Sequence, residues 1–135
     1  MHDHLTAVEA ASVWSGALIL VLLVLSLRVV SNRRRHKVLF GDGGVEEMTL
    51  ATRAFGNASE YIPAGIGALI LLALIGSQNW VIHAVGAALL VGRIVHGWGL
   101  RFGQGPGMGR IVGMGLTWVA LFAAAGMMII CPHLR

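Results

Sequence analysis

Four long runs of apolar residues, separated by short polar connections, dominate this chain. They cover approximately residues 8–30, 48–75, 80–100 and 111–130, and each is long enough for the roughly 20 residues of helix that cross a bilayer. In the second run only the second half is continuously apolar, because the first half carries charged and amide side chains. The pattern predicts an all-α membrane protein, a four-helix transmembrane bundle in which residues 1–135 form a single domain.

The composition supports this assignment. Hydrophobic residues make up 56% of the chain and charged residues 12%, with a mean hydropathy of +0.78, which is more apolar than a soluble domain of this size requires. The sequence pI of about 10.7 could indicate nucleic-acid binding. However, the basic residues gather at the ends of the apolar runs, where anionic lipid head groups attract them. We therefore expect membrane lipids, and no nucleic acid, as partners.

Basic residues also distinguish the two sides of the membrane. Residues 33–37 contain three arginines and a lysine, and Arg101 and Arg110 follow the third run. The connection 76–79 contains neither lysine nor arginine. Because short basic connections stay in the cytoplasm, we expect both of these there and both termini outside.

A stripe of polar side chains interrupts the second run. Arg53, Asn57 and Glu60 are spaced i, i+4 and i+7, so they share one face of a helix. Arg93 and His96 in the third run fall in the same leaflet under the predicted topology. Ionisable groups at membrane depth are costly and mark functional sites, and arginine pairs well with carboxylates. These residues therefore predict a polar, anionic ligand that enters from the cytosol.

Structural roles for the same residues remain open. The basic segment 33–37 can serve only as a topological anchor. Arg53 and Glu60 can neutralise each other inside the bundle, and His96 can be a hydrogen-bonded residue of the helix interior. His2 and His4 flank Asp3 at the start of the chain, but a terminal segment is a poor metal site, and we expect no metal.

Small residues four positions apart indicate close helix contacts. Gly109 and Gly113 form one such pair, and Ala88 and Gly92 form another. Four helices enclose little interior, so a polar pocket is easier to enclose between subunits. These faces therefore favour an oligomer.

A resemblance to a known family rests first on residues 53–63, which read Arg-Ala-Phe-Gly-Asn-Ala-Ser-Glu-Tyr-Ile-Pro. This segment resembles the second-helix signature of the membrane-associated proteins in eicosanoid and glutathione metabolism, the MAPEG family. Residues 26–34 resemble the end of the first helix in the leukotriene-forming synthase of that family, and residues 40–44 resemble its small bacterial branch. The resemblance covers nearly the whole chain and implies a bacterial inner-membrane protein.

The resemblance also implies an assembly and a ligand. Members of the family form homotrimers that bind glutathione between neighbouring subunits on the cytoplasmic side. The residues that it places around this co-substrate are Ser26, Arg33, Arg53, Asn57, Glu60, Tyr61, Arg93 and His96. Glutathione carries two carboxylates and an ammonium group, which suit arginines and Glu60 respectively.

Gly107 stands where the family has the arginine that activates the thiol, so Arg101 or Arg110 is expected to take this catalytic role. The resemblance then implies a transferase or peroxidase that uses glutathione on a lipophilic electrophile. A non-catalytic lipid- or glutathione-binding member of the same fold is the alternative. A small proton-coupled multidrug transporter fits less well, because such proteins carry a carboxylate in the first span and residues 10–30 contain none.

Overall fold

The computed structural model describes residues 2–99 and 107–131, which fold into four helices. These are α1 (His2–His36), α2 (Glu46–Leu74), α3 (Asn79–Gly99) and α4 (Met108–Ile130). Each helix is long and apolar enough to cross a membrane. The predicted four-helix membrane bundle is thus confirmed.

The helices extend beyond the apolar runs of the sequence, most clearly in α1. This helix has 35 residues, a length of roughly 52 Å at about 1.5 Å per residue, whereas the hydrocarbon core of a bilayer is about 30 Å thick. Its last turns, which hold Arg33, Arg34, Arg35 and His36, therefore continue into the polar region. We call the end of the bundle where α1 ends and α2 begins the basic end.

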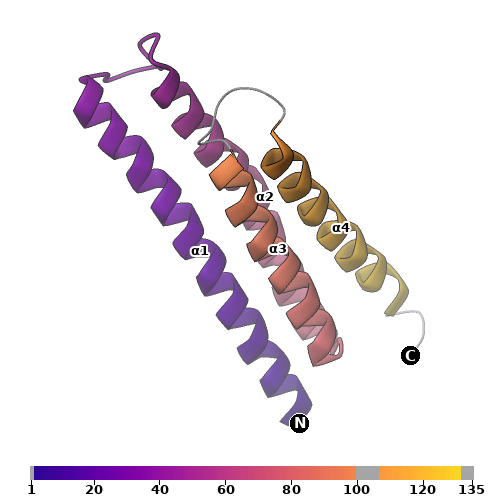
Figure 1. Cartoon of the computed structure of the whole chain (residues 1–135). Coiled ribbons are helices and arrows are strands. Elements are labelled where there is room, and N and C mark those ends of the chain that lie inside the picture. The colour runs from indigo at the N-terminus through magenta and orange to yellow at the C-terminus, as the bar shows by residue number, and fades with distance from the viewer. Residues whose placement is uncertain (1, 100–106, 132–135) are drawn as a thin grey trace.

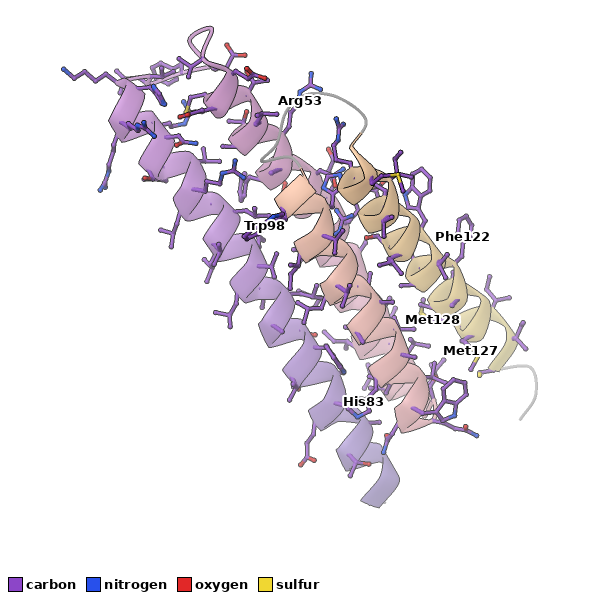
Figure 2. The ribbon with its side chains drawn as sticks, viewed as in Figure 1. Arg53, His83, Trp98, Phe122, Met127 and Met128 are labelled. Atoms are coloured by element: carbon purple, nitrogen blue, oxygen red, sulfur yellow. The ribbon has the colours of Figure 1, made fainter. Side chains whose placement is uncertain are left out.

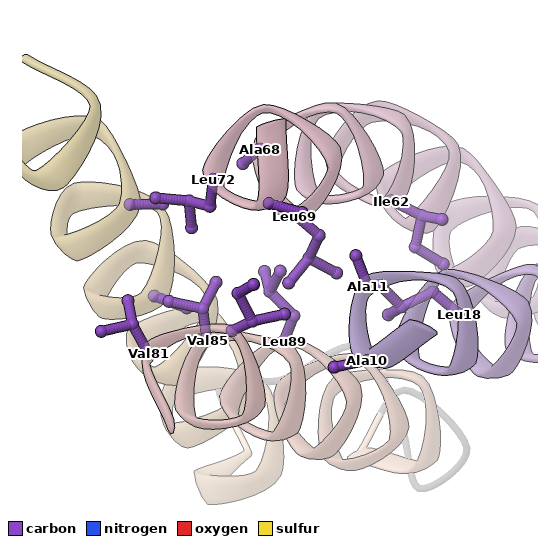
Figure 3. Packing of buried hydrophobic residues seen from close by; sticks show 14 of the residues in the cluster. Ala10, Ala11, Leu18, Ile62, Ala68, Leu69, Leu72, Val81, Val85 and Leu89 are labelled. Carbon is purple, nitrogen blue, oxygen red and sulfur yellow. The ribbon is translucent and has the colours of Figure 1, made fainter. Parts of the chain in front are cut away.

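The two central helices hold the bundle together. Figure 1 shows α1 and α4 on opposite sides, with α2 and α3 between them. Both α2 and α3 pack against every other helix, whereas α1 and α4 hardly touch each other. Leu69 and Leu72 of α2 join Val85 and Leu89 of α3 in the buried cluster, beside residues of α1 (Figure 3). Large apolar side chains remain exposed on the outer faces of α1 and α4, where lipid or a neighbouring subunit can cover them.

Glycines allow α3 and α4 to approach closely. A Cβ atom added at Gly113 would lie 2.5 Å from the His96 nitrogen and 2.6 Å from the Gly92 oxygen. A Cβ atom added at Gly109 would lie 3.1 Å from the Gly99 Cα atom. The small-residue pair Gly109 and Gly113 thus serves packing within the chain. This pair therefore gives no support to the expected oligomer, which stays a prediction, because helix contacts within a chain and between subunits have the same spacing.

Polar contacts order the connection between α1 and α2. The Nη1 atom of Arg33 donates to the carbonyl oxygens of Leu39 at 3.0 Å, Gly41 at 3.3 Å and Val38 at 3.4 Å. The Gly44 backbone N–H and the Thr49 hydroxyl both donate to the Asp42 carboxylate. These two hydrogen bonds, chiefly the one from Gly44, hold the pKa of the Asp42 carboxyl below its ordinary value. The connection is therefore a defined structure, even though its side chains Leu39 and Phe40 are exposed.

Candidate functional site

The polar stripe of α2 lines a cavity near the basic end. This polar cavity has a volume of about 330 Å³ and is bounded by Arg53, Gly56, Asn57, Glu60, His96 and Arg110. Three helices contribute to it, since His96 belongs to α3 and Arg110 to the first turn of α4. Figure 2 shows Arg53 on α2 near the basic end. The structure thus brings five of the candidate residues around one space.

Arg93 lies beneath this cavity and connects three helices. Its side chain is only 2% exposed. The guanidinium donates to Asn57 Oδ1 on α2 at 2.6 Å and to Thr117 Oγ1 on α4 at 3.0 Å. Longer contacts run to the Gly113 carbonyl at 3.4 Å and the Met114 sulfur at 3.3 Å. A buried charge needs such partners, and here they fix the Asn57 side chain on the wall of the polar cavity.

Tyr61 extends the same network. Its ring centroid lies 5.3 Å from the Arg93 Cζ atom, a distance typical of a cation–π contact. The indole N–H of Trp118 donates to the Tyr61 hydroxyl at 3.3 Å. Tyr61 is therefore held by α3 and α4, and it does not itself line the polar cavity.

A second cavity adjoins the first through two shared residues. This apolar cavity, of about 450 Å³, is lined by His96, Arg110, Ile111, Met114, Gly115 and Trp118. His96 and Arg110 also line the polar cavity. A polar ligand and an apolar ligand could therefore meet at this shared wall.

The charges of the polar cavity do not cancel. Arg53 and Arg110 face one carboxylate, Glu60, and the buried Arg93 lies below them. Among the described residues, Arg53 and Glu60 form no ion pair with each other, and Arg93 pairs with no carboxylate. The described structure therefore does not support the interpretation that Arg53 and Glu60 neutralise each other through an ion pair. The excess of positive charge favours an anionic ligand.

Three candidate residues lie elsewhere or cannot be placed. Ser26 is half-buried on α1, and Arg33 binds the α1–α2 connection; neither lines the polar cavity of its own chain. Arg101 lies outside the described residues. Their proposed roles toward a ligand remain predictions.

Two contributors were not anticipated as parts of the site. Thr117 is fully buried and supports Arg93, and it also donates to the Gly113 carbonyl at 2.8 Å. Met114 approaches Arg93 with its sulfur and lines the apolar cavity. An isolated threonine four residues after Gly113 in an otherwise apolar run is the signal that could have indicated this face of α4.

Comparison with known proteins confirms the resemblance. The model of the MAPEG family matches residues 11–130. The chain is 39% identical over 102 residues to the Inner membrane protein YecN of Escherichia coli (strain K12), and this match covers 76% of each protein. The protein of the same name from Escherichia coli O6:H1 matches equally well. The helices, the second-helix signature and these matches agree, and the chain belongs to the MAPEG family.

Proposed function

We propose that this protein is a glutathione-dependent transferase or peroxidase that acts on lipophilic electrophiles. The observation that carries the proposal is the wall shared by the two cavities, where His96 and Arg110 face both a polar and an apolar space. A polar thiol and an apolar second substrate need such adjoining sites.

Glutathione suits the polar cavity by charge. Its two carboxylates would pair with arginines, of which Arg53 and Arg110 line the cavity, and its ammonium group would pair with Glu60. The Asn57 side chain, positioned by Arg93, would bind a peptide group of the tripeptide. In a homotrimer, α1 of a neighbouring subunit would cover the open side of the cavity and contribute its own Ser26 and Arg33.

The chemistry would depend on a thiolate. Arg110, at the wall between the cavities, would lower the pKa of the glutathione thiol by its charge. The thiol proton would pass to solvent, and the sulfur would attack the electrophilic carbon. A carbon–sulfur bond would form as the leaving group departs with its electron pair.

A charge exchange between Arg53 and Glu60 tests binding. If each residue holds one end of glutathione, both Arg53→Glu and the double variant Arg53→Glu with Glu60→Arg should bind it at least roughly thirty-fold more weakly, since one charge-assisted contact contributes about 2 kcal/mol. Titration calorimetry on purified protein measures this, with Arg34→Glu on the exposed surface of α1 as the control. A double variant with wild-type affinity would remove the support for this site.

A thiolate measurement separates the enzyme from the non-catalytic binding protein. Bound glutathione should show thiolate absorbance near neutral pH in the wild type, and less in Arg110→Ala. The variant Arg101→Ala should be measured beside it, because the resemblance allows either arginine this role. If the wild type binds glutathione without thiolate formation, the protein is a binding member of the family.

A further inference from the structure

Two large apolar side chains lie outside the apolar runs, in the connection between α1 and α2. Leu39 is 82% exposed and Phe40 is 89% exposed, the highest values for large apolar residues in the part of the chain that the structure describes. Figure 1 shows this connection at the end of the bundle opposite the start of α1. We call Leu39 and Phe40 the apolar tip. A partner that covered it would remove apolar area from water.

Hydrogen bonds hold the apolar tip in place from both sides. The Arg33 guanidinium donates to three backbone carbonyl groups within residues 38–41. After the tip, the Asp42 carboxylate accepts hydrogen bonds from the Gly44 backbone and the Thr49 hydroxyl. The tip is thus exposed by an ordered connection. A surface that is already formed loses little conformational entropy when it binds a partner.

The same hydrogen bonds set the depth of the apolar tip relative to the bilayer. Arg33 lies three residues beyond Val30, the end of the first apolar run, or roughly 4.5 Å along the helix axis. Because its side chain binds residues 38–41, the connection turns back to the level of Arg33. The head-group layer extends about 5–8 Å beyond the hydrocarbon core on each side. The apolar tip therefore lies at the depth of the head groups.

Cations flank the apolar tip. Arg34 and Lys37 are exposed, and neither forms an ion pair with another described residue. Of the three carboxylates within residues 33–47, those of Asp42 and Glu47 already bind groups of this chain. Arg34 and Lys37 are thus available to lipid phosphates. A surface with apolar residues between cations matches the boundary between acyl chains and anionic head groups.

We infer that the apolar tip inserts into the head-group layer of the leaflet at the basic end and anchors the connection to anionic lipid. Leu39 and Phe40 would contact the first acyl carbons, and Arg34 and Lys37 would bind phosphates. The inference does not depend on the proposed function, because none of these four residues lines the polar or the apolar cavity.

Quenching by labelled lipids tests the insertion. A bimane label would be attached to Leu39→Cys in the full-length Cys131→Ala protein, reconstituted in vesicles of phosphatidylcholine and phosphatidylglycerol. We expect blue-shifted emission, and quenching by lipids that carry a nitroxide near the head group. The matched control is a label at Glu46→Cys, an exposed polar position at the start of α2, which should be quenched much less. Equal quenching at both positions would overturn the insertion of the tip.

Further variants separate the apolar contact from the charges. Phe40→Ser should reduce the quenching of the Leu39→Cys label, whereas Phe122→Ser, at an exposed position of α4, should leave it unchanged. Arg34→Gln combined with Lys37→Gln should reduce it only in vesicles that contain phosphatidylglycerol. A blue-shifted label that lipid nitroxides do not quench would overturn the inference, since a second copy or another protein would then cover the tip. A label that emits as in water would overturn it as well.

Discussion

Arg93 is the residue on which the geometry of the site depends. It is buried, it lies on α3, and its Nη1 and Nε atoms donate to Asn57 of α2 and Thr117 of α4, respectively. The planar guanidinium offers donors in several directions at once, which a lysine ammonium on a flexible stem does not. The position of the Asn57 amide in the polar cavity is therefore a consequence of the guanidinium shape.

We expect Arg93→Lys to destabilise the protein by roughly 2 kcal/mol or more, because at least one buried partner loses its hydrogen bond. Thermal unfolding in detergent measures the change, and Arg34→Lys at an exposed position is the control. Glutathione affinity should fall in Arg93→Lys and stay constant in the control. Unchanged unfolding of Arg93→Lys would mean that shape complementarity at this position is unimportant.

Helical spacing was sufficient to find part of this site. Arg53, Asn57 and Glu60 share a face because of the helix period alone, so the sequence predicted their proximity. The isolated threonine could mark a face of α4, but the approach of Thr117 and Met114 to Arg93 could not be predicted, because it depends on how far α4 is shifted along α3. The glycine contacts between the two helices set that shift, and one sequence does not reveal it.

At the scale of elements, α3 and α4 are the most closely packed pair of helices in the bundle. Gly92 and Gly99 on α3 face Gly113 and Gly109 on α4. This contact places His96 against α4 and so defines the wall between the polar and apolar cavities. The apolar runs predicted that both helices exist. The apolar runs did not show that the glycines mediate the contact between α3 and α4, as opposed to a contact between subunits.

We expect Gly113→Ala to destabilise the protein by about 1–3 kcal/mol, the usual cost of overpacking. The new methyl group would meet the backbone of His96 and Gly92, which can move only if the helices separate. Gly126→Ala is the matched control on the same helix, since nothing lies within 4 Å of its added Cβ atom. Chemical or thermal unfolding of both variants compares them, and equal stability would contradict the close crossing.

At the scale of the whole molecule, the bundle is open because α1 and α4 hardly meet. Their outer faces expose large apolar residues such as Leu20, Leu27 and Phe122. The fold class followed directly from the apolar runs, since only helices with internally satisfied backbones fit their length in lipid. The number of subunits does not follow from the same pattern, because lipid and protein cover apolar faces equally well.

The charge distribution predicts the orientation of the bundle. In a Cys131→Ala background, a cysteine at the exposed Gln78 should react with an impermeant reagent added outside intact cells. A cysteine at Phe40, which is 89% exposed in the α1–α2 connection, should react only after the membrane is opened. The reverse labelling pattern would place the basic end outside the cell and would contradict the proposed entry of glutathione from the cytosol.

The division of the polar cavity among helices also has a consequence for synthesis. A nascent chain presents α1 and α2 to the membrane first, so the Asn57 amide leaves the ribosome before the Arg93 guanidinium that binds it. Thr117, the other partner of Arg93, arrives last. A chain interrupted before Arg93 therefore leaves an amide in the bilayer without this partner, whereas the finished subunit satisfies it.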